Sequence, residues 1–298
     1  MTVSLADVVS LLCCPEDRGR LRQMNGELRC DTCERGFPKY GENLVEILPA
    51  CQQQLPSSIG LDYREGYKEA FARKYYDDPE SLAWAAEERV PDSWRVRRCR
   101  QVEFVRPLIT EGTRRGDSVL CDIAAGAGYY TLAYAQLFRL TLHCDLSVHN
   151  LSYARRKAHS LGIENIFFIR SDYFAPPFRN SVDRLLCMDT LIHGETHESL
   201  LLATIANSLN ADGFALLDFH NWWHNPLRRL GLLPNNFAKN RSYTKRELKH
   251  LLASRHIVPS GFFSFIQELN GNGVGQNLLR RTMPATRFLV RIQRNHGS

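Results

Sequence analysis

The sequence lacks any apolar run long enough to cross a membrane. No apolar span of about 18 residues is present, and no basic, apolar leader is recognisable, so we expect a cytoplasmic chain with no membrane partner. Internal repeats and low-complexity tracts are absent as well, which argues against a repeat protein. The sequence also lacks a large excess of one sign of charge, because the net charge is only +6 over 298 residues.

The remaining composition is that of an ordinary globular protein. Hydrophobic residues make up 44% of the chain and charged residues 23%. A chain of 298 residues is long enough for a full α/β domain with a small additional domain.

A short loop of small residues is the most informative feature. The apolar run that begins at Val119 ends in Asp122, and the loop Ala124-Ala125-Gly126-Ala127-Gly128 is followed by an amphipathic segment. This order predicts a buried strand, a tight turn and a helix N-terminus, as at the nucleotide pocket of doubly wound α/β folds. A dinucleotide fingerprint requires a third glycine, where this chain has Thr131, so that match is partial. It also remains open at this point that the turn binds no ligand at all.

The three strands predicted next each end in aspartate. The segments are Leu140–Asp145, Ile166–Asp172 and Val182–Asp189. Carboxyl ends of parallel strands share one edge of a sheet, where ligands bind, and an acid about 20 residues after the glycines suits a ribose. Asp145 lies 17 residues after Gly128. Each aspartate alone is also typical of a helix cap or a turn.

Together these segments resemble the first motifs of class I S-adenosylmethionine (SAM)-dependent methyltransferases, with Ala124 where the first glycine usually stands. The resemblance implies SAM as cofactor, with a ribose acid at Asp145 and an adenine acid at Asp172. It also implies that the segment after the fourth strand lies under the methionine part of SAM. The candidate cofactor-binding residues are Asp122, Ala124, Gly126, Gly128, Tyr129, Asp145, Leu146, Asp172, Tyr173, Met188, Asp189 and His193.

The later segments complete the same fold class, an α/β protein with a doubly wound, mostly parallel, seven-stranded sheet. We expect a capping box at Thr244-Lys245-Arg246-Glu247 to open a helix that runs to about Ser254. The other expected elements are a helix over Glu198–Leu209, a turn at Asn210–Gly213, a strand over Phe214–His220, and a closing antiparallel pair, Ile257–Glu268 with Ala285–Gln293.

The first 50 residues resemble the short zinc-ribbon domain that activates some methyltransferases and is fused to others. The pattern places Cys14, Asp17, Cys30 and Cys33 as ligands, with Asp17 where the family has cysteine. Zinc accepts a carboxylate oxygen, so the resemblance implies a structural zinc site. Cys13 is an alternative fourth ligand, and a ribbon that kept its fold without the metal is another interpretation.

These segments divide the chain into a ribbon-like domain (1–56), a helical linker or lid (57–111) and a SAM-binding domain (112–298). We expect helices over Glu65–Tyr76, Ser81–Ala86 and Asp92–Leu108, the last ended by Pro107. We expect the tyrosines of the first two helices to line either a substrate pocket or the core. We expect the arginines between Arg95 and Arg106 to form either a surface that binds phosphates or an ordinary solvated surface.

Histidines follow the fourth and fifth predicted strands. His193, His220 and His224 are the candidate catalytic residues, since histidine is the usual base near neutral pH. The alternative is that they are ordinary surface or strand-end residues. Methyl transfer itself can proceed by positioning, with one base or none.

Three functions fit these observations. The first is a small-molecule methyltransferase, with natural-product biosynthesis as one setting, because the long segment Asn221–Tyr243 resembles a substrate loop. The second is an rRNA or tRNA base methyltransferase, although the sequence has no N-P-P-aromatic motif. The third is an atypical SAM protein that catalyses another bond-forming step or scaffolds a partner. The ribbon could bind a partner enzyme or a second copy of the chain.

Overall fold

Two β-sheets organise the part of the chain that the structure describes. The computed structural model describes residues 3–50, 92–113, 116–190, 198–221, 230, 232, 242–253, 258–265 and 287–293. One sheet has three antiparallel strands and lies near the N-terminus, and the other has nine strands.

The N-terminal unit is small and stabilised by short antiparallel pairs. Its helical segments are α1 (Leu5–Val8) and the 3-10 turn η1 (Val9–Leu11), and its strands are β1 (Leu21–Met24), β2 (Glu27–Cys30) and β3 (Gly36–Pro38). Leu28 and Phe37 face each other across β2 and β3 and are fully buried. Because β1 pairs with β2 and β2 pairs with β3, the loops before β1 and after β2 lie side by side. This arrangement places the predicted metal ligands together.

Seven strands of the large sheet match the predicted order. They are β5 (Val119–Ile123), β6 (Leu140–Asp145), β7 (Ile166–Ser171), β8 (Val182–Cys187), β9 (Leu209–Asn221), β11 (Val258–Phe265) and β12 (Arg287–Gln293). The spatial order is β11-β12-β9-β8-β5-β6-β7, with β12 antiparallel to both neighbours and the other pairs parallel. Strands β5 and β6 are buried at every residue, because helices cover both faces of a parallel sheet.

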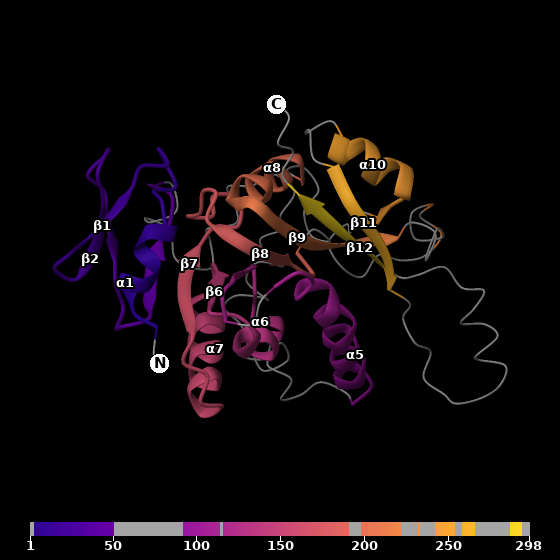
Figure 1. Ribbon diagram of the computed structural model, residues 1–298, viewed down its shortest axis with the longest axis horizontal. Coiled ribbons are helices and arrows are strands. Elements are labelled where there is room, and N and C mark those ends of the chain that lie inside the picture. Colours follow the sequence, from indigo (N-terminus) through magenta and orange to yellow (C-terminus); the bar gives the residue numbers. More distant parts are fainter. Residues whose placement is uncertain are drawn as a thin grey trace.

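Helices cover the two faces of this sheet in separate layers (Figure 1). Three lie on one face: α5 (Asp92–Ile109), α6 (Tyr129–Tyr134), which continues into η2 (Ala135–Leu137), and α7 (Val148–Ser160). The other face carries α8 (Glu198–Ser208) and α10 (Lys245–Ala253). None of the described helices is long and apolar enough to span a bilayer.

The N-terminal unit adds a strand to the large sheet, which the sequence did not predict. Strand β4 (Leu44–Ile47) pairs in parallel with β7 and extends the sheet beyond the expected seven strands; the two-residue β10 (Ser242–Tyr243), paired with β9, is the ninth. The guanidinium of Arg170 in β7 contacts Glu46 in β4 at 2.5 Å, and both side chains are largely buried. The edge strand β7 is therefore covered by the N-terminal unit, which removes an exposed row of backbone donors and acceptors.

Helix α5 is confirmed to within one residue of the predicted Leu108. Pro107 lies inside its last turn and does not end it, because the backbone angle of proline is compatible with a helix. The turn expected at Asn210–Gly213 lies inside β9 as an irregularity, where Leu209 faces Val182 and Phe214 faces Arg184. A Cβ atom on Gly213 would lie 2.7 Å from the Val182 carbonyl oxygen, which explains the glycine.

The other expected elements of this part are confirmed within a few residues. The capping box is present, since the Thr244 N–H donates to Glu247 Oε2 (2.7 Å) and the Glu247 N–H donates to Thr244 Oγ1 (3.2 Å). The predicted helices over 65–76 and 81–86, with their tyrosines, lie outside the described residues.

Candidate functional site

The turn between β5 and α6 has three residues in the left-handed backbone region. They are Ala124 (φ 53°), Gly126 (φ 57°) and Gly128 (φ 85°). A Cβ atom on Gly126 would meet no atom within 4 Å, so this part of the turn faces open space. At Gly128 a Cβ atom would lie 3.1 Å from the Ala154 Cβ, so glycine lets α7 pack close beneath the turn. The loop of small residues therefore combines a required backbone shape with an open approach.

Asp145, at the end of β6, is bound to this turn. Its Oδ2 accepts a hydrogen bond from the Gly126 N–H (2.8 Å), and Oδ1 accepts from the Ser147 N–H (2.8 Å) and the Asn150 amide (3.4 Å). The carboxylate is buried, and burial raises the pKa of Asp145, while the N–H groups of Ser147 and Gly126 lower it. The predicted ribose acid is thus fixed in orientation beside the glycine turn.

A buried chain of polar side chains lies beneath the same turn, and no local sequence motif marks it. The Thr131 hydroxyl in α6 lies 2.6 Å from Asp122 Oδ2, to which it donates, and 2.9 Å from Nδ1 of His143, with which it shares a second hydrogen bond. Burial raises the pKa of Asp122 to about 7 and lowers the pKa of His143 to about 3. Sequence reasoning treated Thr131 only as a missing glycine, yet it joins β5, α6 and β6.

The predicted adenine side lies after β7. Asp172 is fully buried, and its Oδ1 accepts from the Phe174 N–H (2.9 Å). The rings of Tyr173 and Phe174 lie 4.3 Å apart, centroid to centroid. The N-terminal unit holds the next residues, because the Arg18 guanidinium donates to the backbone oxygens of Pro176 (2.9 Å) and Phe178.

Charged side chains from two strands, from a helix and from the segment after β8 meet at this edge of the sheet. Arg287, at the start of β12, forms ion pairs with Asp189 and with Asp218 of β9. Asp189 has a left-handed backbone (φ 58°), its N–H donates to Asp218 Oδ1 (2.7 Å), and its Oδ2 lies 3.3 Å from the Arg98 guanidinium in α5. Burial alone would lower the pKa of Arg287, but the two carboxylates more than reverse this and raise it. We call these four side chains the ion-pair cluster.

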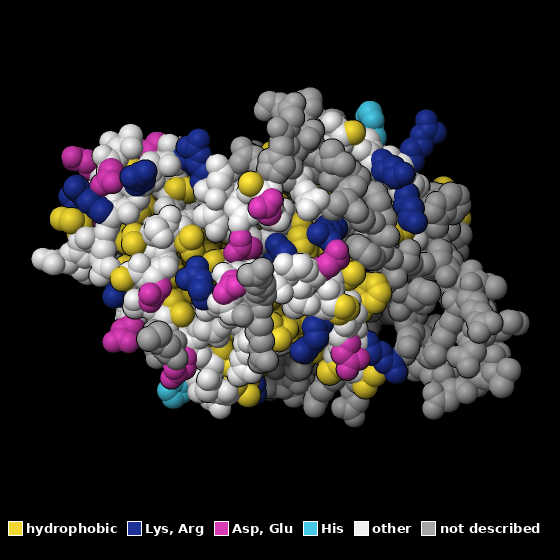
Figure 2. Space-filling view, in the orientation of Figure 1, with side chains coloured by type: hydrophobic (Ala, Val, Ile, Leu, Met, Phe, Trp, Pro, Cys, Tyr) yellow, Lys and Arg dark blue, Asp and Glu magenta, His cyan; other side chains and the backbone are white. Residues whose placement is uncertain are grey.

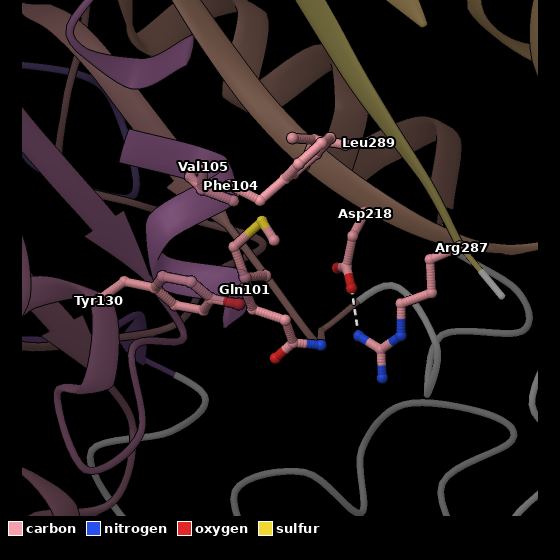
Figure 3. A pocket seen from close by; sticks show the side chains of 8 residues that line it. Gln101, Phe104, Val105, Tyr130, Asp218, Arg287 and Leu289 are labelled. Atoms are coloured by element: carbon pink, nitrogen blue, oxygen red, sulfur yellow. Dashed lines mark hydrogen bonds and ion pairs between the residues drawn. The ribbon is translucent and has the colours of Figure 1, made fainter. Parts of the chain in front are cut away.

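A pocket opens between the ion-pair cluster, α5 and α6 (Figure 3). It is a partly open hollow, and its space amounts to about 270 Å³ only when the open solvent within it is counted. Its polar lining comes from Gln101, Asp218 and Arg287. Its apolar lining comes from Phe104, Val105, Tyr130, Met188 and Leu289. Sequence reasoning expected a substrate site at this sheet edge but named neither Gln101, Arg287 nor Asp218, because no local motif marks them.

Of the three candidate catalytic histidines, the structure describes His220. It lies near the end of β9, half-buried, opposite Arg287 in the adjacent strand. His193 and His224 lie outside the described residues, so their roles stay predictions. The other predicted cofactor residues, Tyr129, Leu146 and Met188, lie at the same carboxyl edge, where the Arg98 guanidinium stacks 5.2 Å from the Tyr129 ring centroid.

The four predicted metal ligands gather in the N-terminal unit. The ligand atoms of Cys14, Asp17, Cys30 and Cys33 all lie within 4.8 Å of one another, and Cys13 is not part of this group. The Sγ atoms of Cys14 and Cys33 are 3.7 Å apart, and Cys30 Sγ is 3.4 Å from Asp17 Oδ1. A tetrahedral site with Zn–S bonds of about 2.3 Å and a Zn–O bond of about 2.0 Å requires edges of about 3.8 and 3.5 Å.

Each ligand pair also ends in the same backbone shape. The residue after Asp17 is Arg18 (φ 62°), and the residue after Cys33 is Glu34 (φ 59°). The Thr32 N–H donates to Cys30 Sγ at 3.3 Å. Two loops of equal geometry therefore direct their ligands at one point, as a tetrahedral metal site requires.

Comparison with known proteins agrees with this fold. Residues 120–213 match a family model described as a methyltransferase domain. No curated protein matches the chain. Among solved structures, magnesium protoporphyrin IX methyltransferase (ChlM) from Synechocystis PCC 6803 with bound SAH has a TM-score of 0.56 and 18% identity. The alignment covers 76% of this chain and 99% of that one.

Two further structures show the same similarity. One is a chain of the complex between the Haloferax volcanii Trm112 methyltransferase activator and a methyltransferase (TM-score 0.55, 16% identity, 72% of this chain and 97% of that chain). The other is a SAM-dependent methyltransferase from Clostridium acetobutylicum ATCC 824 (0.51, 15%, 76% and 98%). At these identities the similarity establishes the fold, and it confirms the expected fold class.

Proposed function

We propose that this SAM-dependent methyltransferase of the class I fold transfers a methyl group to a small molecule. The observation that carries the cofactor assignment is the Gly126 turn with Asp145 fixed beside it at 2.8 Å. The open space at Gly126 and the orientation of Asp145 fit a cofactor whose ribose hydroxyls need an acceptor. Bound SAM supplies a methyl group that its sulfonium leaving group already activates.

The chain's own residues have a positioning role in this proposal. Asp145 and the backbone amides of the turn bind SAM and orient it. Asp172, Tyr173 and Leu146 contact its adenine ring. Met188 and Asp189 form the floor after β8. Holding two reactants in the required geometry supplies about 7–11 kcal/mol of barrier reduction, so one histidine base or none is sufficient.

A small acceptor agrees with the pocket and with the way the described arginines are used. The pocket is walled by α5, α6, β9 and β12, which suits a small molecule better than a polymer. Arg98 faces Asp189 and Tyr129, and the Arg106 guanidinium stacks 5.9 Å from the Tyr134 ring centroid. On the face shown in Figure 2, basic and acidic side chains are interspersed, without a continuous basic surface for phosphates.

The cofactor assignment is tested by calorimetry of the purified chain with S-adenosylhomocysteine (SAH) and, separately, with NADH. We expect saturable SAH binding that falls at least tenfold in Asp145→Ala, since the carboxylate provides charged hydrogen bonds worth about 1.5–3 kcal/mol. Asp212→Ala is the matched control, because Asp212 is exposed. Binding of NADH without SAH would overturn the cofactor assignment, and salt-dependent methylation of RNA alone would overturn the small-molecule acceptor.

We further propose that Cys14, Asp17, Cys30 and Cys33 bind a structural zinc ion. The separations within the cluster and the two equal loops support this. Metal analysis of the purified chain should give one zinc per chain, retained in Asp17→Cys and lost in Cys30→Ala. Cys99→Ala is the control, since Cys99 is an exposed free cysteine on α5. A chain that is folded and free of zinc after expression in zinc-containing medium would contradict the proposal.

A further inference from the structure

Two neutral polar groups lining the pocket make no hydrogen bond to another described residue. The Gln101 side chain is 5% exposed, and its amide is directed toward the space between Tyr130 and Arg287 (Figure 3). Tyr130 is also 5% exposed, and its ring contacts Tyr129 and Tyr134 while its hydroxyl end points to the same space. Neither residue is among those whose buried polar atoms lack a partner, so the polar ends of both side chains reach the open space of the pocket, where a ligand can bind them.

The charged groups at the pocket cancel one another. Arg287 pairs with Asp189 and Asp218, and Arg98 pairs with Asp189, so two guanidinium groups face two carboxylates. An added anion would approach Asp218, and an added cation would approach Arg287. Because a charged ligand would lose its hydration without gaining an unpaired counter-charge, this pocket disfavours ionic groups.

The remaining lining is apolar and in part aromatic. Phe104 and Val105 come from α5, Met188 follows β8 and Leu289 comes from β12. These side chains offer area for an apolar body and no hydrogen-bonding group apart from the weak acceptor sulfur of methionine. Polar recognition must therefore come from Gln101 and Tyr130.

We propose that this pocket binds the methyl acceptor, and that the acceptor is an uncharged, mainly apolar molecule whose hydroxyl, carbonyl or amide group hydrogen-bonds to Gln101 and Tyr130. The inference rests on the proposed function and names its substrate class. Both side chains can donate and accept, so they suit a neutral polar group of either kind. The role of the ion-pair cluster is to hold the floor of the pocket at Asp189, and it does not bind a charge on the acceptor.

Four related probes test this choice on the full chain saturated with SAH. They are naphthalene, 2-naphthol, 2-naphthoate and 2-naphthylmethylammonium, which share one apolar body and differ in the polar group. Calorimetry or ligand-observed NMR should show tightest binding for 2-naphthol. Tightest binding of the anion or the cation, equal binding of naphthol and naphthalene, or no saturable binding of any probe would overturn the proposal.

Two nearly isosteric variants assign the hydrogen bonds. Gln101→Leu and Tyr130→Phe should each weaken 2-naphthol binding about 2- to 12-fold, the equivalent of one net hydrogen bond of about 0.5–1.5 kcal/mol. Naphthalene and SAH binding should stay unchanged. Gln136→Leu and Tyr40→Phe make the same chemical changes at exposed positions and should change nothing.

Thermal unfolding of the unliganded variants separates a binding role from a structural one. If Gln101 and Tyr130 serve the ligand, removal of their polar atoms leaves the melting temperature close to that of the wild type, because no hydrogen bond within the protein is lost. A clear fall in the melting temperature of both variants would show structural hydrogen bonds and overturn the assignment. Failure of the wild-type chain to bind SAH would instead overturn the proposed function, whatever the probes do.

Discussion

The two halves of the sheet's carboxyl edge are built from different kinds of contact. In the half formed by β5 and β6, Asp145 is held by backbone N–H groups of Gly126 and Ser147, so most of its contacts are close in the sequence or belong to one motif. In the half formed by β8, β9 and β12, Arg287 reaches Asp189 and Asp218, which lie 98 and 69 residues away. We call these the turn half and the pocket half.

The two halves should therefore respond differently to substitution. Neutral N–H donors hold a carboxylate without any charge partner, so the turn half can keep one shape while the rest of the site changes. In the pocket half each buried charge is neutralised by the others, so removal of one side chain leaves another charge buried and unpaired. The turn half should therefore tolerate conservative changes better than the pocket half.

The largest effect should come from Arg287→Met. Loss of the guanidinium leaves Asp218 buried without its ion pair, while Asp189 keeps only Arg98 at 3.3 Å, which should lower the free energy of unfolding by about 3–5 kcal/mol in denaturant titrations at neutral pH. Arg22→Met is the control, because the Arg22–Asp31 pair (3.3 Å) is about half exposed and such pairs contribute about 0–1 kcal/mol.

The pH dependence of this loss distinguishes charge from packing. Burial raises the pKa of Asp218, and protonation of this carboxylate removes the uncompensated charge, so the difference between wild type and Arg287→Met should shrink as the pH falls. A difference that stays constant with pH would show that Arg287 acts through its packing, and the contrast between the two halves would then fail.

Asp122 gives the next largest effect, in the turn half. Its pKa in the folded state is about 7, against about 3.8 for the ordinary group, and burial is the main cause. Between these values the folded state binds more protons than the unfolded state, so Asp122 lowers stability progressively as the pH rises from about 4 to about 7. The change is at most about 4 kcal/mol, at 1.36 kcal/mol per unit.

The measurement is the free energy of unfolding of wild type minus that of Asp122→Asn across this pH range. The difference should fall with rising pH and level off above about pH 7. The pKa of His143 is about 3 in the folded state against 6.5 for the ordinary group, so His143 makes stability rise with pH over part of the same range. This contribution is present in both proteins and cancels in the difference. A difference that is flat or rises with pH would contradict the burial of an ionisable group beneath the turn.

A matched pair of glycines tests the open side of the turn half. Gly126 and Gly162 both have left-handed backbones (φ 57° and 65°), and at neither would a Cβ atom meet another atom within 4 Å. Gly126→Ala and Gly162→Ala should therefore lose similar stability, about 1–2 kcal/mol. Only Gly126→Ala should weaken SAH binding, as calorimetry would measure. Equal SAH affinity in both variants would show that the ligand does not approach Gly126.

The same contrast explains how much the sequence predicted. Strand order, the turn and Asp145 follow from patterns within single segments, since burial on both faces gives continuous apolar strands and small residues mark the turn. Gln101, Arg287 and Asp218 carry no such signal, because only the packing of α5, β9 and β12 brings them together. The pairing of β4 with β7 was missed for the same reason, since either edge of a sheet can accept a short apolar strand.

The smallest effect should come from the capping box of α10, which measures how much stability one hydrogen bond between residues close in sequence contributes. Thr244 accepts from the Glu247 N–H through its hydroxyl, so Thr244→Ala leaves one helix N–H without its partner and should cost about 1 kcal/mol. Thr244→Ser keeps the acceptor and should be close to wild type in the same denaturant titrations. Because α10 lies on the opposite face from the pocket, both variants should bind SAH like wild type. A loss from Thr244→Ala as large as that from Arg287→Met would mean that contacts close in sequence are no weaker than those across strands, and the contrast between the two halves would not hold.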